Sequence, residues 1–396
     1  MWFTSPVPST FTWLDTTTRE QRRALEVIDL FALRDTVDQL GIGSVRDAWA
    51  ERLSPGTSTI QTRARYFFFV PWIYEAVRRD SRRSGGAGAR ARRYELRLVD
   101  AILAADEGGV PIGARVGRGL KQLPSTIYWA GLGRYGIRLW QGSQAAFHRA
   151  LPGLGPEAWH PHLPAAPEGF LDCSALALER SEAEFFREQI RAHAPGSLLQ
   201  FLMDVDTGEA NVQFPWEHPL RGRFGSELER WVHHAEAFAL HMHGAALLYN
   251  RMLAERLGPS SHLEPEECVE RYGRELVRWS DDVATWRGAG SSWDRREFWR
   301  LTQVINPRVP PQTRAFCEAW LERVLGAQSP LDLMDEGFAR QLVERREVRL
   351  KGHRSRLRNR EQLERWGGRS GAGRLDYRWG ITQRLVRDVQ EGLGRG

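Results

Sequence analysis

Apolar residues recur at helical spacing along most of this chain. Leu25, Ile28 and Phe31 are three residues apart, and similar three- and four-residue intervals continue toward the C-terminus. No alternating apolar and polar pattern is long enough for a sheet, so we expect a mainly α, multi-domain helical protein. The spacing and its breaks predict helices over residues 15–35, 45–53, 57–74, 182–192, 196–204, 226–257, 265–286, 293–304, 312–325, 332–364 (with interruptions) and 375–392.

Polar residues before several apolar runs predict where helices begin. Ser44, with Asp47 three residues later, resembles a capping box for the helix over 45–53. Thr57, Ser58 or Thr59 is expected to cap the next helix, which would carry Gln61, Arg63, Arg65 and the run YFFFVPWIY (66–74). We expect Arg63 and Arg65 to support this part of the fold through their stems and guanidinium groups.

Glycine- and proline-rich stretches divide the chain. Residues 80–93 (DSRRSGGAGARARR) are typical of a flexible basic linker, and residues 152–175 of an irregular crossing. A chain of 396 residues also exceeds one ordinary core. We therefore predict an N-terminal helical unit (1–83), a possible helix-turn-helix or winged-helix unit (94–150), a central helical region with a long histidine-bearing helix (151–265) and a C-terminal basic helical region (266–396).

The segment 94–150 has the layout of a helix-turn-helix. Leu96, Val99 and Leu103 predict one helix, and apolar positions 112, 116 and 120 predict a second. Ser125 would cap a third helix, and the residues after Gly136 could begin a wing. Tyr128 and Trp129 on the third helix could either stack on bases or belong to the core.

The charges of this segment favour nucleic acid. The chain has a formal net charge of +6, and 54 of its 56 basic residues are arginine, a side chain that binds phosphate bidentately. No Asp or Glu occurs over residues 108–156. An acid-free basic surface suits a phosphate backbone. The predicted contacts here are Arg115, Arg118, Lys121, Ser125, Thr126, Arg134 and Arg138.

A second basic stretch covers residues 340–360. This stretch holds nine basic residues and two acidic ones, Glu344 and Glu347. The resulting positive charge is more than solubility requires. A phosphate-bearing or acidic partner would account for the excess. The predicted contacts are Arg349, Lys351, Arg354, Arg356 and Arg358.

The long histidine-bearing helix offers an alternative function. Glu229, His233, Glu236 and His243 fall along one helical stripe, so a second helix could complete a metal site for a hydrolase or nuclease. However, the order of Glu236 and His233 reverses the usual Glu-x-x-His motif, and the continuation GAALLYN (244–250) is typical of a packed core helix. We expect the helix to be structural, with no metal or other cofactor.

Common catalytic motifs and targeting signals are missing from the sequence. It contains no GxxxxGK[ST], HxKxxxxD, HExxH or GxSxG motif, and three distant cysteines favour neither disulfides nor zinc. The N-terminus lacks a signal-peptide pattern, and nine apolar residues with a proline cannot span a bilayer. We expect a cytoplasmic protein with no membrane partner. The missing catalytic motifs favour a protein that is not an enzyme.

Several blocks of the sequence resemble the bacterial domain-of-unknown-function family 6361. They are FTWLD (11–15), LGIG (40–43) with Arg46-Asp47, PGTSTIQTRARYFFFVPW (55–72), LPSTIYW (123–129), PWE (215–217), GAALLYN (244–250) and LDYRW (375–379). The resemblance spans nearly the whole chain and brings no catalytic residues. It implies an accessory subunit of a multi-gene phage-defence system, with helicase or nuclease subunits as partners.

Taken with the charges, these features favour a nucleic-acid-binding accessory protein, with DNA as the expected nucleic acid. Two alternatives stay open. One is the metal-dependent hydrolase or nuclease described above. The other is a structural adaptor that binds protein partners through tryptophan-rich grooves, since the chain has 16 tryptophans.

Overall fold

The computed structural model describes residues 38–80, 85–105, 111–113, 122–208, 210–258 and 261–394. Within these ranges the regular structure is helical, and the β contact is a single isolated bridge between Arg138 and Trp159. The predicted helix over 15–35 lies outside the described residues. The α-helices are α2 (Gly43–Leu53), α3 (Tyr66–Arg79), α4 (Ala87–Ala104), α5 (Pro124–Arg134), α6 (Gln144–Ala150), α7 (Arg180–His193), α8 (Leu198–Asp204), α9 (Ser226–Glu255), α10 (Pro265–Gly288), α11 (Arg295–Ile305), α12 (Pro311–Gly326), α13 (Gly337–Lys351), α14 (Arg360–Glu364) and α15 (Trp379–Leu393).

Short 3-10 helices fill several of the connections. The irregular crossing predicted over 152–175 contains two of them and no α-helix. The mainly α fold class is thus confirmed, and most predicted helices lie within a few residues of their observed positions. The 3-10 helices are η2 (Leu151–Gly153), η3 (Pro156–Ala158), η4 (Pro215–Glu217), η5 (Pro219–Arg223), η6 (Pro330–Met334) and η7 (Gly352–Arg354).

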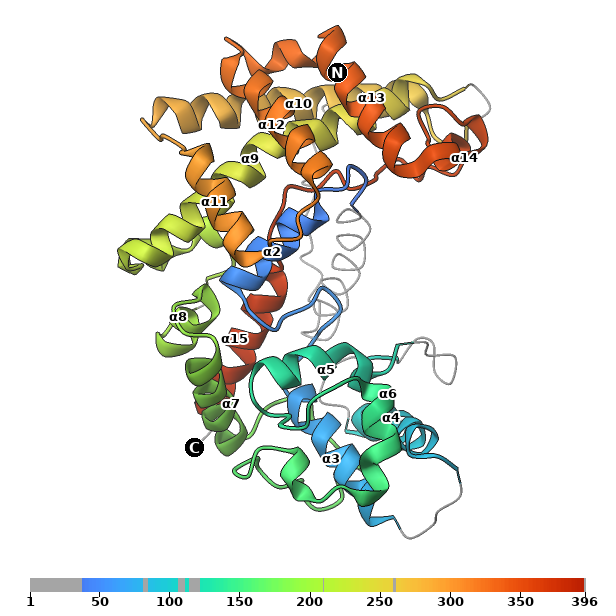
Figure 1. Ribbon diagram of the computed structural model, residues 1–396, viewed down its shortest axis with the longest axis vertical. Helices are drawn as coiled ribbons and strands as arrows, with labels where there is room; N and C mark the ends of the chain where they lie inside the picture. Colours follow the sequence, from blue (N-terminus) through green and yellow to red (C-terminus); the bar gives the residue numbers. More distant parts are fainter. Residues whose placement is uncertain are drawn as a thin grey trace, which may run out of the picture.

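Two groups of helices lie at opposite ends of the molecule (Figure 1). Helices α3–α6 gather at one end, α9–α14 gather at the other, and α2, α7, α8 and α15 lie between them. Buried side chains from all of these parts form one continuous hydrophobic cluster. None of the described helices is long and apolar enough to cross a membrane. The predicted division of the chain into four units stays a prediction.

Helix α3 is the core of one end. The residues of its aromatic run are buried, and the Phe67 ring lies 4.9 Å from the ring of Tyr128 and 4.8 Å from that of Phe186. Aromatic pairs at this spacing add stability beyond the area that they bury. The run YFFFVPWIY (66–74) is therefore the centre of a helical core.

Helices α9 and α10 are the core of the other end. Gly244 of α9 faces Trp279 of α10 so closely that a Cβ there would lie 2.3 Å from the indole ring. The Trp279 Nε1 donates to the Leu240 carbonyl oxygen at 2.9 Å. The interpretation of GAALLYN as a packed core segment is confirmed, because the small residue allows the two helices to approach.

Helix α15 ties the C-terminus to the segment before α3. Arg63 Nε lies 2.8 Å from Asp388 Oδ1, and the Ala64 backbone N donates to the same carboxylate at 2.7 Å. Arg65 pairs with the buried Glu182 of α7 at 2.8 Å. The predicted structural role of Arg63 and Arg65 agrees with these contacts.

Three local predictions were wrong. Helix α2 begins at Gly43 and is capped by the Asp38 carboxylate, which accepts from the backbone N of Ile42 and Gly43 at 2.9 and 2.6 Å, so Ser44 does not cap it. Helix α3 begins at Tyr66, and no side chain of the 57–59 stretch caps it. Residues 57–65, the expected first turns, are not helical because their backbone N–H groups bond elsewhere. The N–H of Thr62, for example, donates to the Tyr128 hydroxyl.

The basic linker is also shorter than predicted. Helix α4 already begins at Ala87, inside the stretch 80–93 that was expected to be flexible. Arg90 anchors this start, because its guanidinium donates to the carbonyl oxygens of Val77 and Asp80 at 3.0 and 3.3 Å. These hydrogen bonds from Arg90 hold the start of α4 in place, although the glycine-rich composition favours a flexible segment.

Candidate functional site

The predicted helix-turn-helix unit corresponds in part to α4, α5 and α6. A winged-helix arrangement is not confirmed. The helix predicted over 112–120 falls mostly outside the described residues, together with Arg115, Arg118 and Lys121. After α5 the chain forms the bridge between Arg138 and Trp159 where a wing was expected.

Side chains at the start of α5 face the protein interior. Leu123, not Ser125, occupies the N-cap position. Ser125 is 1% exposed, and its backbone N donates to the Glu95 carboxylate at 2.6 Å. Thr126 is more exposed, with its hydroxyl donating to Gln144 at 3.0 Å. Of these two, Thr126 alone lies at the surface.

The aromatic pair of α5 belongs to the core. Tyr128 is fully buried, and its hydroxyl donates to the Arg63 carbonyl oxygen at 2.9 Å. Trp129 is half-buried, and the guanidinium of Arg138 lies 4.4 Å from its ring centre. The core interpretation is therefore confirmed for Tyr128, whose burial does not fit stacking on bases, and Trp129 packs against that core while partly exposed.

The two described arginines predicted here have protein partners. Arg138 is buried and donates to the carbonyl oxygens of Trp140 and Trp129. Arg134 is 43% exposed, donates to the His193 carbonyl oxygen and lies 3.5 Å from Glu51. Arg138 is therefore part of the fold, while Arg134 retains an exposed face.

The second basic stretch divides into internal and exposed residues. Lys351 Nζ lies within hydrogen-bonding distance of three acceptors: Gln39 Oε1 at 2.6 Å, the Tyr249 hydroxyl at 3.0 Å and Glu347 Oε1 at 3.2 Å. An ammonium group has three donors, so none is left for a ligand. Burial lowers the pKa of Lys351. Arg356 likewise donates to Ser370 Oγ at 2.7 Å, and both residues hold the end of α13 in place.

Three other arginines of this stretch are exposed and form no ion pair with the residues that the structure describes. Arg345 has one weak partner, Gln341 at 3.2 Å, one turn earlier on α13. Arg349 and Arg354 are exposed and have no hydrogen bond or ion pair with any residue that the structure describes. Arg358 is 64% exposed but pairs with Glu344 at 3.1 Å. The end of α13 therefore presents guanidinium groups that no carboxylate of the described chain neutralises.

The carboxylates of the histidine helix are occupied by one arginine. Arg221 of η5 binds Glu229 at 2.7 Å and Glu236 at 2.8 Å. Both carboxylates lie on α9 as the sequence predicted, but they are used to attach the preceding turn. This arrangement stabilises the N-terminal half of α9.

The histidines of the stripe bond to backbone carbonyl groups of two different segments. His233 Nε2 lies 2.7 Å from the Ser292 oxygen, and His243 Nε2 lies 2.9 Å from the Ala372 oxygen. Burial lowers the pKa of His243 to about 4, so it is neutral and can donate one N–H here. Among the described residues, no three His, Cys, Asp or Glu side chains lie close enough to hold a metal ion.

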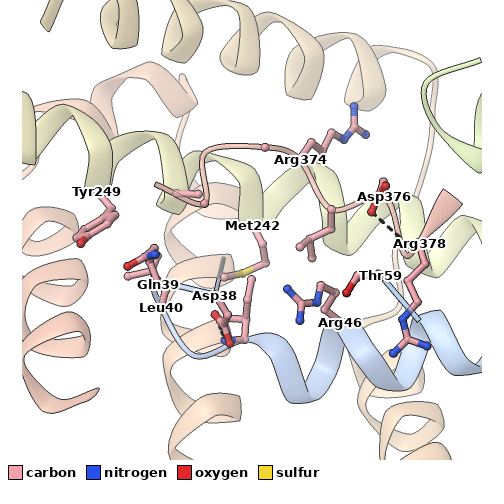
Figure 2. Close-up of a pocket in the computed structure, with 15 residues that line it drawn as sticks. Asp38, Gln39, Leu40, Arg46, Thr59, Met242, Tyr249, Arg374, Asp376 and Arg378 are labelled. Atoms are coloured by element: carbon pink, nitrogen blue, oxygen red, sulfur yellow. Dashed lines mark hydrogen bonds between the residues drawn. The ribbon is translucent and has the colours of Figure 1, made fainter. Parts of the chain in front are cut away.

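A small cavity lies where α2, α9 and the loop before α15 meet (Figure 2). Its volume is about 60 Å³, and its walls combine apolar and charged side chains. Arg46 points into it from α2, Met242 contacts it from α9, and Asp376 lies at its far end. The lining residues are Asp38, Gln39, Leu40, Ile42, Arg46, Thr59, Met242, Ala246, Tyr249, Gly371, Gly373, Arg374, Leu375, Asp376 and Arg378.

The backbone beside this cavity is strained. Tyr377 and Arg378 have φ angles of 54° and 65°, the left-handed region that side chains larger than glycine disfavour. The Tyr377 hydroxyl donates to the Ala235 carbonyl oxygen at 2.9 Å, and Arg378 donates to that of Thr57 at 2.6 Å. Such strain persists where surrounding contacts enforce it, and it is frequent at binding sites.

Sequence reasoning missed this cavity, although its signal was present. Four of the blocks that carry the family resemblance meet there: LGIG with Arg46 (40–46), PGTST (55–59), GAALLYN (244–250) and LDYRW (375–379). Each block alone explains little. Only the fold shows that segments more than 300 residues apart line one space.

Comparison with known proteins identifies one family. The family described as "Family of unknown function (DUF6361)" matches residues 8–392. No curated protein and no solved structure matches the chain.

Proposed function

The chain belongs to the family of unknown function DUF6361, and from its surface chemistry we propose that it binds nucleic acid through phosphate contacts, as a non-catalytic subunit of a larger assembly. DNA is the proposed nucleic acid. The observation that carries this proposal is the pair Arg345 and Arg349 on α13, with Arg354 in the following turn.

Arg345 and Arg349 are one helical turn apart, about 6 Å along the axis. Like charges at this spacing destabilise a helix by roughly 0.2–0.5 kcal/mol. The exposed Arg354 follows in the next turn, so the positive charge continues past the helix end. An arrangement that works against the helix on its own is favourable when a polyanion lies across it.

Several other exposed arginines of this chain pair with a carboxylate of their own helix. Arg180 pairs with Glu184 at 3.1 Å, Arg274 with Glu270, and Arg360 with Glu364 at 3.2 Å, each one turn apart. Their charge is neutralised within the same helix. The exposed end of α13, where Arg345 and Arg349 lie one turn apart without an acidic partner, differs from these three pairs in the direction that phosphate binding requires.

The contacts described above support this function over its two alternatives. The candidate metal ligands Glu229 and Glu236 are held by Arg221. The adaptor hypothesis relied on tryptophan-rich grooves, but the described tryptophans are buried or partly buried and none is among the exposed large apolar side chains. The exposed guanidinium groups of Arg345, Arg349 and Arg354, in contrast, are available to bind a ligand.

The test is a comparison of two triple variants that change the net charge equally. Arg345, Arg349 and Arg354 are replaced by glutamine in one, and the ion-paired Arg180, Arg274 and Arg300 in the other. Dissociation constants for a labelled DNA duplex are measured by fluorescence anisotropy at 100 mM salt. We expect the first variant to bind about tenfold more weakly than wild type, and the control about as well. If both variants lose DNA affinity equally, the loss comes from the lower net charge and not from these three arginines.

The wider assembly that we propose is a multi-gene phage-defence system with helicase or nuclease subunits, and its support is the family resemblance. Partners can be identified by purifying the tagged chain from its native host, with and without nuclease treatment. Partners retained after nuclease treatment contact the protein itself. Partners that are lost were held through the nucleic acid.

A further inference from the structure

An exposed aromatic ring lies on the same side of α13 as two of the arginines of the proposed function. Phe338 is 45% exposed, and it is the one exposed phenylalanine, tyrosine or tryptophan in the part of the chain that the structure describes. Arg345 and Arg349 follow it by seven and eleven residues. Because an α-helix turns about 100° per residue, the three side chains lie within about 20° of one line along the helix.

The Phe338 ring is held in place by the neighbouring helix. The guanidinium carbon of Arg323 on α12 lies 4.1 Å from the centre of the ring and covers one of its faces. Arg323 also pairs with Glu336 at 3.3 Å, which fixes the guanidinium over the ring. The exposed part of the ring is therefore its other face and its edge. A ring that is positioned before a ligand arrives loses little conformational entropy on binding.

The charges along this line change from the ring to the arginines. Asp335 and Glu336 lie just before the ring, so a phosphate is disfavoured there and a neutral group is not. Farther along the helix, Arg345 and Arg349 are exposed without an acidic partner, and Glu344 beside them is already paired with two other arginines. The face therefore offers a flat apolar surface at one end and phosphate-binding groups at the other.

We propose that this face of α13 binds single-stranded DNA, with an unpaired base stacked on the Phe338 ring and phosphates of the same strand on Arg345 and Arg349. Proteins that bind single strands combine aromatic rings, on which bases stack, with a basic track for the backbone. Such stacking accepts any base, because every base has a π-face. This inference rests on the proposed function, because it uses the same arginines.

A duplex meets the arginines but not the ring. In a double helix each base is stacked between its neighbours, and a protein reaches the edges of the bases through the grooves. The face of a base is then hidden from a ring on the protein surface. Phe338 should therefore contribute to the binding of a single strand and not to the binding of a duplex.

The test uses three labelled ligands of equal length: a single strand, the duplex of that strand, and a strand whose sugar-phosphate backbone carries no bases. Their dissociation constants are measured by fluorescence anisotropy at one salt concentration. We expect Phe338→Ala to weaken binding of the single strand about tenfold, which is within the range for loss of one stacked base. Binding of the duplex and of the base-free strand should change less than about twofold, because neither brings the face of a base to the ring.

Further variants separate stacking from apolar contact and from loss of folding. Phe338→Tyr keeps the ring and should bind the single strand like wild type, whereas Phe338→Leu keeps an apolar side chain without a ring and should bind as weakly as Phe338→Ala. The control Val304→Ala shortens a side chain of α11 that is 72% exposed, and it should leave all three ligands unchanged. The inference is overturned if Phe338→Leu binds the single strand like wild type, or if Phe338→Ala weakens all three ligands equally.

This inference and the proposed function fail separately. Suppose that the Arg345/Arg349/Arg354 variant loses all three ligands while Phe338→Ala binds the single strand like wild type. The stacking of a base is then refuted, and phosphate binding by the arginines stands. If the wild-type protein binds none of the three ligands at 50 mM salt, the proposed function is refuted, and this inference with it.

Discussion

Arg63→Gln removes the cation from a largely buried ion pair that joins α15 to the segment before α3. The Asp388 side chain is 4% exposed, and Arg63 contacts both of its oxygens, at 2.8 and 3.1 Å. Without Arg63 the carboxylate keeps one donor, the Ala64 backbone N. Breaking a buried pair from one side costs about 3–5 kcal/mol. Because Arg63 is 25% exposed, we expect the lower end, about 3 kcal/mol, at pH 8.

The loss should depend on pH. Burial raises the pKa of Asp388 from its ordinary value of 3.8 to about 6 in the folded protein, even with Arg63 present. As the pH rises from about 4 to about 6, the folded protein retains a proton that the unfolded chain releases, so the contribution of Asp388 to stability declines over that window. Without Arg63 the folded pKa rises further. At pH 5 the carboxyl is then neutral, and the penalty shrinks to the lost hydrogen bonds, about 1 kcal/mol.

Urea unfolding followed by tryptophan fluorescence at pH 8 and pH 5 measures this difference. The control is Arg387→Gln, because Arg387 is exposed on the same helix and has no partner among the described residues. We expect the Arg63 variant to lose about three times more unfolding free energy at pH 8 than at pH 5, and the control to change little at either pH. An equal loss at both pH values, or a larger loss at pH 5, would show that the charge of Asp388 is not what Arg63 compensates.

Three further substitutions or measurements test other parts of the structure. Gly244→Ala should destabilise the protein by at least about 2 kcal/mol in thermal or urea unfolding, because its Cβ would lie 2.3 Å from the Trp279 ring. The control Gly273→Ala, on helix α10, should be close to neutral, because its Cβ would meet only the flexible end of Arg251. Burial raises the pKa of Glu95 to about 7, so the stability that this group contributes below about pH 4.5 is lost as the pH rises to 7. Glu95→Gln should remove that decline, so the stability of the variant relative to wild type should be higher at pH 8 than at pH 5. An identical pH profile of unfolding free energy in both proteins would contradict this. Elemental analysis of the purified protein should show no stoichiometric zinc, manganese or iron, and one tightly bound metal per chain that is lost in the His233→Ala, His243→Ala double variant would restore the hydrolase alternative.

The sequence was informative about helices because helical periodicity is a local property. The 226–257 and 375–392 predictions agree closely with α9 and α15, whose apolar faces pack against neighbouring helices. It was less informative about helix starts. The backbone N of Ala64 bonds to Asp388, which is 324 residues away along the chain, and a partner so distant is set by the fold.

The candidate site could be predicted only in part. Charge density drew attention to residues 340–360, but it could not separate Lys351, which is surrounded by acceptors, from Arg349, which is exposed. Burial depends on which helix covers which face. The blocks that carry the family resemblance could not be assembled into a cavity from the sequence, because Arg46 and Asp376 line one space only after α2 and the loop before α15 are brought together.

The most direct test of phosphate binding is the salt dependence of duplex affinity. The logarithm of the dissociation constant is plotted against the logarithm of salt concentration for wild type, the Arg345/Arg349/Arg354 variant and the Arg180/Arg274/Arg300 control. Each phosphate contact contributes a slope of about 0.9 on duplex DNA, so three lost contacts should flatten the slope by about 2.7 in the first variant and leave it unchanged in the control. A wild-type affinity that does not depend on salt, or no binding at 50 mM salt, would contradict nucleic-acid binding by this protein.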